Sequence, residues 1–317
     1  MRGEHRPEIS VVVPTYGREA MLLDCVAGII AGDLGSFEIL VIDQDQRKGL
    51  ERALPERFPA ERRIRYFLAP LAGASAARNL GVREARADIV AFIDDDALPE
   101  AGWLRAFVES FASVTPRPGL IGGKIEPLWA RAKPGWYPSE REFLLGLYDI
   151  GDEARPFPEK DQPVAANMAG WRDTVRALGG FDERLGPNYF RRHPMITGED
   201  ALLGERVRRA GFPVYYQPKA RVRHRISRAK LTRRYFLRRH FWEGVTTAAQ
   251  FHLLAEPQPP AVYLAARVTR DLAHAAVPRL AGRDAARRPS PSRMLALSDL
   301  AFSLGLGYGR MTLPDRA

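Results

Sequence analysis

The stretch that most constrains the fold is the apolar run at residues 89–93 (IVAFI), which three aspartates follow directly. An uncharged run of this length is typical of a strand buried on both faces of a parallel sheet. The three carboxylates, Asp94, Asp95 and Asp96, repel one another unless a cation lies beside them. Carboxylate oxygens are ligands that Mg²⁺ and Mn²⁺ prefer. The pattern therefore predicts either a divalent metal site at the end of a buried strand or, more simply, an acidic turn that closes the strand.

Comparable apolar runs alternate with helical spacing along the first hundred residues. Strands are expected at 9–13, 37–42, 64–67 and 89–93, and helices at 19–30, at 49–58 and in an alanine-rich stretch that ends near residue 86. Pro14 and Pro99 are expected to end strands. This alternation predicts an α/β fold, with a Rossmann-like, mostly parallel sheet flanked by helices.

The second predicted strand also ends in acid, with Asp43 followed by Asp45. Because ligands of open α/β sheets bind beyond the carboxyl ends of the strands, we expect a nucleotide pocket at this edge. The glycine fingerprint of dinucleotide-binding domains and the P-loop pattern are both absent from the sequence, which disfavours a classical dehydrogenase and a P-loop enzyme.

The later part of the chain is expected to alternate less regularly. We expect a helix from 103 to 111, a strand at 120–125, short strands at 214–216 and 220–223, and amphipathic helices at 261–280 and 294–307. Residues 130–163 are rich in proline, glycine and aromatic residues. We interpret this segment as the acceptor-side loop, with a purely structural excursion as the alternative.

The net charge of +10 indicates polyanionic partners. Ten Lys or Arg residues lie between positions 219 and 239, with no acid and with several aromatic residues among them. They could neutralise a departing diphosphate, hold a phosphorylated lipid acceptor or dock on an anionic membrane, or simply form a solvated helix face. A nucleic-acid groove ranks last, because binding nucleic acid needs none of the acidic residues at the strand ends.

The remaining composition favours a cytoplasmic protein, at most peripheral to the inner face of the membrane. Residues 1–8 are polar, and no uninterrupted apolar stretch approaches the ~18 residues of a spanning helix. Cys25 is the single cysteine, so no disulfide forms within one chain, and it reads as a small buried hydrophobe.

Four short motifs follow the predicted elements in turn. They are Pro14-Thr15-Tyr16 after the first strand, Asp43 after the second strand, Ala77-Arg78-Asn79 after a glycine loop, and Asp94-x-Asp96 after the fourth strand. In this order the sequence resembles the family 2 glycosyltransferases of the GT-A fold, over about residues 9–224. The resemblance implies a catalytic domain at 1–228, with a nucleotide-binding half at 1–125 and an acceptor half at 126–228. A basic, amphipathic helical region would follow at 229–317.

The resemblance also implies roles for the residues at the strand ends. Pro14, Thr15 and Tyr16 would border the base and ribose, and Asp43 would accept a hydrogen bond from the base. Arg78 would face the nucleotide or its phosphates, although a surface charge on a helix is an equal alternative.

The resemblance assigns the metal site to the aspartate triplet. Asp96 would bind a divalent cation, Mg²⁺ or Mn²⁺, and Asp94 would hold the ribose or a metal-bound water. Asp95 occupies the variable middle position beside the nucleotide. His224 directly follows a predicted strand and would complete the metal shell. A lone histidine is as often an ordinary polar residue.

Glu199 and Asp200 open a predicted helix, where the helix dipole favours anions and a capping role is a serious alternative. Their position after residues 165–186, a passage that also resembles the family and would floor the sugar-binding region, favours Asp200 as general base, with Glu199 orienting groups nearby. A base must reach the acceptor hydroxyl by a hydrogen bond.

These residues imply a metal-dependent, inverting transfer of a sugar from a nucleotide-diphosphate sugar to an acceptor hydroxyl. The acceptor would be a sugar, a lipid-linked molecule or a small molecule, in the synthesis of polysaccharide, glycolipid or another glycoconjugate. Two alternatives stay open, a sugar-phosphate nucleotidyltransferase and a non-catalytic nucleotide- or membrane-binding protein. The first normally carries a basic, glycine-rich loop after its first strand, and residues 14–17 (PTYG) do not supply one.

Overall fold

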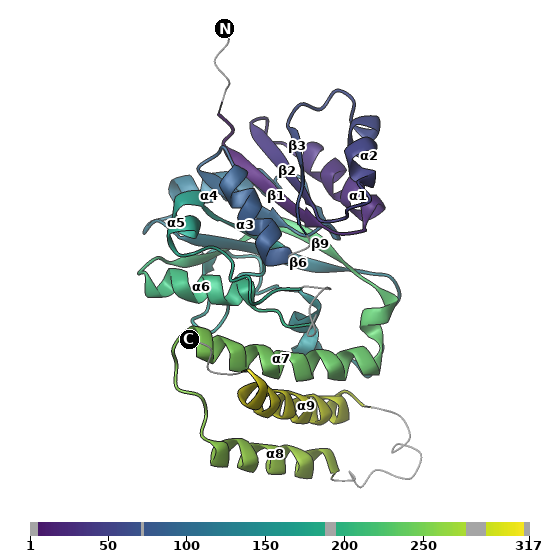
Figure 1. The fold of residues 1–317 in the computed structure, drawn as a ribbon, viewed down its shortest axis with the longest axis vertical. Coiled ribbons are helices and arrows are strands. Elements are labelled where there is room, and N and C mark those ends of the chain that lie inside the picture. Colours follow the sequence, from purple (N-terminus) through teal and green to yellow (C-terminus); the bar gives the residue numbers. More distant parts are fainter. Residues whose placement is uncertain (1–5, 71–72, 188–194, 277–289, 314–317) are drawn as a thin grey trace. The chain divides into compact units, whose positions relative to one another are not determined.

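The computed structural model describes residues 6–70, 73–187, 195–276 and 290–313 of the chain. Its first four strands are parallel and lie in the order β3-β2-β1-β4. Their bounds are Ile9–Thr15 for β1, Phe37–Asp43 for β2, Ile64–Leu68 for β3 and Ile89–Ile93 for β4. The helices between them are α1 (Glu19–Ile30), α2 (Gly49–Arg57) and α3 (Ala74–Glu84) (Figure 1).

The other half of the sheet is antiparallel, so the sheet as a whole is mixed. It continues from β4 in the order β8-β6-β9-β5, and β7 pairs with β9. The strands are β5 (Ala97–Pro99), β6 (Leu120–Trp129), β7 (Arg155–Pro156), β8 (Asn167–Trp171) and β9 (Val214–Ile226). Between β5 and β9 the chain forms four helices, α4 (Trp103–Ser113), η1 (Ser139–Leu145), α5 (Arg172–Ala177) and α6 (Glu199–Arg209).

Two sequence predictions about strands were wrong. Pro14 does not end β1, because the pairing of β1 with β4 stops at Val12 and the proline therefore breaks no hydrogen bond on that side. Residues 214–216 and 220–223 belong to one strand, β9, which continues through Pro218. Pro99, as predicted, ends a strand: it is the last residue of the short strand β5, which pairs with β9 after the turn at the aspartates.

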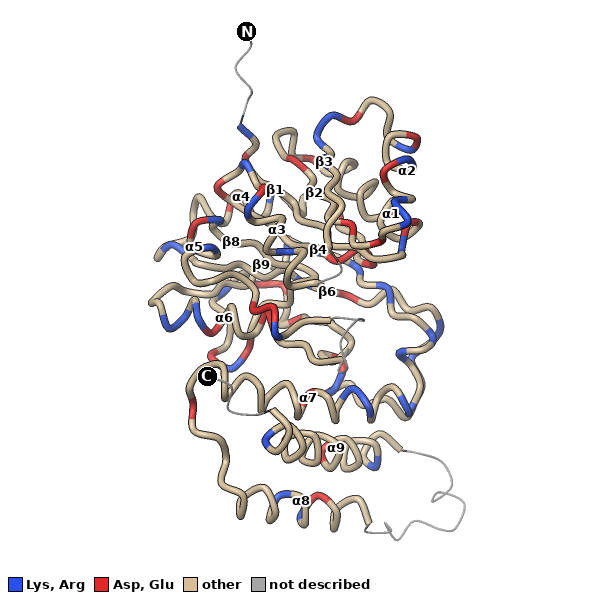
Figure 2. Tube along the Cα trace, viewed as in Figure 1, with Lys and Arg blue, Asp and Glu red and all other residues tan. Residues whose placement is uncertain are grey.

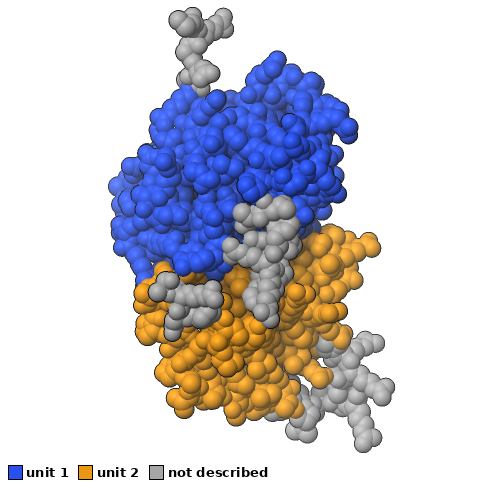
Figure 3. Space-filling model, in the orientation of Figure 1, with its two compact units in different colours: residues 1–128, 146–194, 199–225 blue, residues 129–145, 195–198, 226–317 orange. Residues whose placement is uncertain are grey.

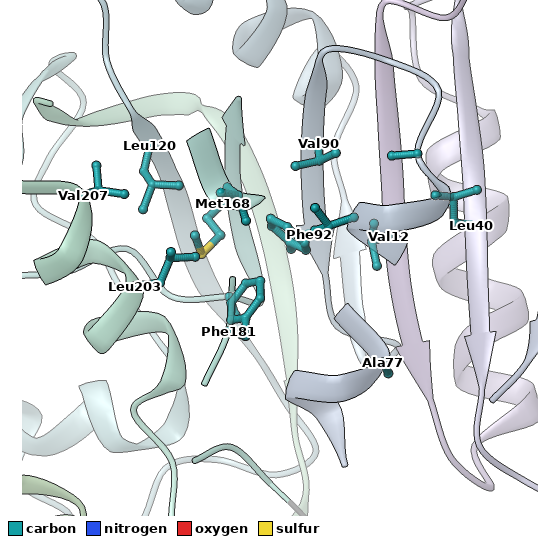
Figure 4. Close-up of a cluster of buried hydrophobic side chains, with 14 of the residues drawn as sticks. Val12, Leu40, Ala77, Val90, Phe92, Leu120, Met168, Phe181, Leu203 and Val207 are labelled. Atoms are coloured by element: carbon teal, nitrogen blue, oxygen red, sulfur yellow. The ribbon is translucent and has the colours of Figure 1, made fainter. Parts of the chain in front are cut away.

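Buried side chains from β1, β2, β4 and β8 form one apolar core with those of α6 (Figure 4). Phe92 of β4 lies at its centre and packs edge-on against Phe181, with ring centroids 4.9 Å apart. Helix α3 packs directly on β1 at Gly81, because a Cβ there would lie 2.3 Å from a methyl group of Val12. The apolar runs seen in the sequence thus become the two-sided burial of a central sheet.

The chain divides into two compact units, coloured in Figure 3. The first comprises residues 1–128, 146–194 and 199–225 and contains the sheet; the second comprises 129–145, 195–198 and 226–317. The second unit consists mainly of η2 (Arg228–Leu231), α7 (Arg233–Leu253), α8 (Ala261–Ala276) and α9 (Pro291–Thr312). Helix α9 packs against both α7 and α8.

The two last helices differ in length from the sequence prediction. Helix α9 is longer than the predicted 294–307 because Ser290 caps its start, accepting a hydrogen bond from the backbone N–H of Arg293. The predicted helix at 261–280 is observed as far as Ala276, and its last four residues lie outside the described ranges. Among the described helices, none combines the length and apolar character that crossing a membrane requires.

Candidate active site

The candidate site lies at the carboxyl ends of β1, β2 and β4, where the strand order changes direction. Strand β1 lies between β2, which follows it in the chain, and β4, which the chain reaches only after β3. The ligand crevice of open α/β sheets is found at such a point. Thr15 at the end of β1 is the direct neighbour of Asp43 at the end of β2.

Asp95 is a buried carboxylate that links the end of β4 to the end of β1. Its Oδ2 accepts a hydrogen bond from Oγ1 of Thr15 at 2.8 Å, and its Oδ1 accepts one from Nη1 of Arg18 at 3.0 Å. Burial raises the pKa of Asp95 to about 6; the charge of Arg18 opposes this rise, and Asp96 adds to it. The middle aspartate of the triplet therefore holds the two strand ends together.

Asp96 faces both an arginine and a histidine. Arg18 Nη1 donates to Asp96 Oδ2 at 3.1 Å, and His224 Nε2 lies 3.2 Å from Asp96 Oδ1. His224 reaches this position because it is the neighbour of Ala97 in the pairing of β9 with β5. Two segments more than a hundred residues apart are thus joined by a strand pairing that the sequence did not reveal.

Asp96 and His224 fit two positions of a divalent metal shell. Two ligands bound about 2.1 Å from an octahedral cation lie about 3 Å apart, close to the observed 3.2 Å. Nδ1 of the buried His224 has no hydrogen-bond partner within the described residues. No group of three or more His, Cys, Asp or Glu side chains in those residues is arranged to hold a metal, so water and substrate oxygens would supply the other ligands.

Asp94, the third member of the triplet, is paired with Arg78 instead. Arg78 Nη2 donates to Asp94 Oδ1 at 2.8 Å, and Arg78 Nη1 donates to Glu199 Oε1 at 2.7 Å. The side chain of Arg78 is 4% exposed, so its guanidinium is enclosed by these two acids. The sequence had placed Arg78 toward the nucleotide; in the structure it links the aspartate triplet to the start of α6.

Glu199 and Asp200 lie in the first turn of α6, but their environments differ. Glu199 is buried, and burial raises its pKa to about 7, with repulsion from Asp200 adding to the rise and Arg78 opposing it. Its Oε2 has no hydrogen-bond partner within the described residues. Asp200 is partly exposed, and its Oδ2 accepts a hydrogen bond from the backbone N–H of Ala165 at 3.0 Å. Of the two, Asp200 is the accessible carboxylate.

The other predicted nucleotide contacts lie at the ends of β1 and β2. Asp43 is buried and accepts hydrogen bonds from the Asp45 N–H at 2.8 Å and the Tyr66 hydroxyl at 3.1 Å. Burial raises the pKa of Asp43, against the effect of the Asp45 N–H. Tyr16 is 38% exposed, whereas Pro14 is buried within β1.

Sequence reasoning missed Arg18, the cation shared by Asp95 and Asp96. Its position directly after residues 14–17 and before α1 was the available signal, because a side chain there lies at the same strand ends as the triplet. Nothing in the sequence alone indicated which acid it would pair with.

The passage at 165–186 forms a scaffold for these residues. The side-chain amide of Asn167 donates to the carbonyl groups of Lys124 and Ala220, and its Oδ1 accepts from Nε1 of Trp103. These contacts join β8, β6, β9 and α4 in the interior. Because every hydrogen-bonding atom of this amide group has a protein partner, we assign Asn167 a structural role in the interior.

The basic stretch at 219–239 divides into two parts. In the first unit Arg225 is paired with Asp24, and Arg223 with Glu100. In the second unit Arg233, Arg234 and Arg238 are exposed in the first two turns of α7 (Figure 2). Cations are unfavourable at the positive end of a helix, so helix stability does not explain them.

Residues 10–136 match the family model described as "Glycosyl transferase family 2". The matched range includes the strand ends that carry Thr15, Asp43 and the aspartate triplet. The chain is 25% identical over 244 residues to the glucosyl-dolichyl phosphate glucuronosyltransferase of Haloferax volcanii, and the alignment covers 75% of each protein.

Two solved structures share the fold. Mannosyltransferase PcManGT from Pyrobaculum calidifontis, in complex with GDP-Man and Mn²⁺, has a TM-score of 0.63 at 17% identity, covering 98% of this chain and 89% of its own. GalNAc-T7 with UDP, GalNAc and Mn²⁺ has a TM-score of 0.55 at 16% identity, covering 82% of this chain. This chain spans about half of the second structure (53%). The predicted α/β fold of the GT-A type is confirmed.

Proposed function

We propose that this glycosyltransferase, whose residues 10–136 form a family 2 domain, transfers a sugar from a nucleotide-diphosphate sugar to an acceptor hydroxyl with inversion at the anomeric carbon. The observation that carries this proposal is the convergence of acids at the strand ends. Asp95 and Asp96 meet Thr15 and His224 there, and Asp94 is joined through Arg78 to the helix that carries Asp200.

The accessible carboxylate of Asp200 is suited to accept the proton of the acceptor hydroxyl. One of its oxygens is oriented by the Ala165 N–H, and a general base must reach the acceptor hydroxyl from such a fixed position. A single displacement by the acceptor oxygen inverts the anomeric centre, by the same stereochemical logic as one-step glycoside hydrolysis.

The nucleotide would lie at the ends of β1 and β2. Pro14, Thr15 and Tyr16 would border the base and ribose, and Asp43 would accept a hydrogen bond from the base. Asp94 and Asp95 would form the wall beside the ribose. Support comes from the neighbouring positions of Thr15 and Asp43 and from the exposed ring of Tyr16.

Asp96 and His224 would hold a divalent cation, Mg²⁺ or Mn²⁺. When bound, such a cation supplies Lewis-acid stabilisation of the departing diphosphate. Mn²⁺ is present in both solved structures that share the fold. Arg18, which contacts Asp96, places a second positive charge at the same point.

A lipid-linked molecule is the class of acceptor that we favour. The Haloferax relative is named for a dolichyl phosphate substrate, and this chain carries exposed arginines at the start of α7 that are suited to bind phosphate. The same cations suit the anionic surface of a membrane, where such an acceptor would lie.

The test is a thermal-shift panel of UDP, GDP and dTDP, with and without Mn²⁺, on wild-type protein and on Asp96→Ala. One nucleotide should stabilise the wild type by more than about 1 kcal/mol only when Mn²⁺ is present, and Asp96→Ala should lose this response. Wild-type protein that responds to none of these nucleotides would contradict the proposed function. An undiminished response of Asp96→Ala would contradict the assignment of the metal ligand.

A further inference from the structure

We propose that Arg78 is a positioning residue that fixes Asp94 and Glu199 in one arrangement and thereby sets the position of the neighbouring base, Asp200. This inference rests on the proposed function, since it concerns the same site. It differs from the nucleotide-facing role that the sequence predicted for Arg78.

The guanidinium of Arg78 bonds to acids on both sides. Its two terminal nitrogens donate to two different acids, Asp94 at 2.8 Å and Glu199 at 2.7 Å. The face of the group lies 5.4 Å from the centre of the Phe181 ring. Because Arg78 is buried on all sides, no terminal nitrogen is turned toward solvent, where a phosphate would have to approach.

Arg78 is held firmly by the contacts of its helix. It projects from α3, and the next residue, Asn79, donates to the Phe181 carbonyl at 2.8 Å and accepts from the Phe181 N–H at 2.9 Å. Ser75, one turn earlier, donates to the carbonyl of Leu185 at 2.8 Å. Helix α3 is therefore fixed to the segment that surrounds the guanidinium.

The space for Glu199 depends on the end of that same segment. Gly186 has a positive φ of 93°, and a Cβ there would lie 2.4 Å from Ser75 Oγ and 3.2 Å from Glu199 Cδ. Only a glycine leaves Ser75 and Glu199 where they are. Gly186, the last residue of the passage at 165–186, therefore belongs to the arrangement that holds Glu199 against Arg78.

Arg78 is connected through Glu199 to Asp200, the proposed base. Glu199 and Asp200 are consecutive in the first turn of α6, so fixing one fixes the backbone of the other. Arg78 holds the side chain of Glu199, and the Ala165 N–H holds that of Asp200. Arg78 also lies close enough to interact electrostatically with Asp200. One guanidinium thus couples the aspartate triplet after β4 to the start of α6.

Geometry explains why the residue must be arginine. The planar fork of a guanidinium bonds two acids in fixed directions at once, whereas a lysine ammonium acts as a point charge. Removing the cation leaves two carboxylates uncompensated in the interior, which disturbs both partners. Arg78→Lys should therefore keep the charge but lose the geometry.

The experiment compares Arg78→Lys and Arg78→Met with a matched control, Arg65→Met. Arg65 is another arginine of the first unit that bridges two acids, Glu38 and Glu84; it is less buried than Arg78 and lies away from the carboxyl ends of the strands. For each protein, the affinities for the nucleoside diphosphate that binds the wild type and for the corresponding nucleoside are measured with Mn²⁺. The rate of a single turnover is measured with the matching nucleotide sugar.

A positioning role predicts a turnover rate about 10²-fold lower in both Arg78 variants, because misplacing a catalytic group by about 1 Å has an effect of this size. The ratio of nucleoside diphosphate affinity to nucleoside affinity should stay within about threefold of the wild type. If Arg78 were a phosphate ligand, this ratio would fall about tenfold or more. A turnover rate like that of Arg65→Met would show a merely structural role and would also overturn the inference.

Glu199→Gln provides a second route that keeps the proposal testable if Arg78→Met fails to fold. If Arg78 acts through Glu199, the effects of Arg78→Lys and Glu199→Gln on the rate should be far from multiplicative in the double variant. Multiplicative effects would contradict the coupling. If the wild-type protein binds no nucleoside diphosphate, the proposed function is refuted. If the wild type turns over and the turnover rate of Arg78→Lys equals that of Arg65→Met, this inference alone is refuted.

Discussion

At the scale of single residues, the three carboxylates of the aspartate triplet differ in their hydrogen-bond and ion-pair partners. Asp94 pairs with Arg78, Asp95 accepts a hydrogen bond from Thr15, and Asp96 faces His224. Arg18 contacts both Asp95 and Asp96. The positive charges of Arg78 and Arg18 offset the repulsion that the sequence pattern implied. Only Asp96 combines an imidazole neighbour with a position suited to a metal ligand.

Asp200→Asn should lower the turnover rate by about 10²–10⁴-fold, because the acceptor proton loses its base. The affinity for the nucleoside diphosphate with Mn²⁺ should not change, since the side chain lies on the acceptor side of the mechanism. Kinetics with the nucleotide sugar that matches the thermal-shift panel check this expectation. Asp173→Asn, at the exposed start of α5, is the control and should retain the wild-type rate. A fully active Asp200→Asn would remove Asp200 from the mechanism.

Glu199 should make the protein less stable as the pH rises from about 5 to 8. Its pKa is about 7 in the folded chain against an ordinary 4.5, so in this interval the folded state holds a proton that the unfolded state has released. The free energy of unfolding therefore falls as pH increases, by at most about 3 kcal/mol, and levels off above pH 7. The raised pKa of Asp95 acts in the same direction.

Urea unfolding at pH 5 and pH 8 measures this dependence, and Glu199→Gln is the informative variant. An amide at position 199 does not titrate, so the variant should lose much less stability between the two pH values than the wild type does. Equal losses in both proteins would contradict the role assigned to Glu199.

At the scale of elements, the position of α3 on the sheet governs how the site is assembled. The helix carries Arg78 and Asn79, and it approaches β1 as closely as it does because position 81 has no side chain. Its sequence predicted an alanine-rich helix but not what the helix faces. The close contact between Gly81 and Val12 explains why this face of α3 lies against β1.

Gly81→Ala should destabilise the protein, because the new methyl group overlaps Val12 and overpacking of this kind costs about 1–3 kcal/mol. The thermal unfolding midpoint should fall, and adding Val12→Ala should restore part of the loss by making room. Gly307→Ala in α9 is the matched control, since a Cβ at that helical position meets nothing within 4 Å. It should leave the midpoint unchanged or raise it. A Gly81→Ala midpoint equal to the wild type would contradict the close packing.

At the scale of the whole molecule, the positive charge belongs to one unit. The second unit contains 18 Lys and Arg against 8 Asp and Glu, whereas the first contains 30 of each, so the net charge of +10 resides in the second. Solubility alone would not require this separation. It supports an anionic partner for the helical unit.

The protein should therefore bind vesicles that contain 30% anionic phospholipid, and salt should weaken the binding by screening. Replacing Arg233, Arg234 and Arg238 with glutamine should reduce binding by about 10²-fold, at about 1 kcal/mol for each cation. The control variant replaces Arg52, Arg57 and Arg62, three exposed cations of the first unit, and should bind like the wild type. Co-sedimentation at 50 and 300 mM salt measures both. Equal binding by the two triple variants would contradict a membrane-facing role of α7.

The sequence by itself determined the alternation of strands and helices and the set of acids at the strand ends. Both are local properties, since apolar periodicity and chain order act over a few residues. Only the tertiary structure decided which partner each acid meets, because Arg18, Arg78 and His224 reach the triplet from the start of α1, from α3 and from β9, across distances in sequence that no local pattern encodes. The antiparallel half of the sheet was hidden for the same reason: the pairing of β5 with β9, which brings His224 to Asp96, depends on hydrogen bonds between segments that only the folded chain brings together.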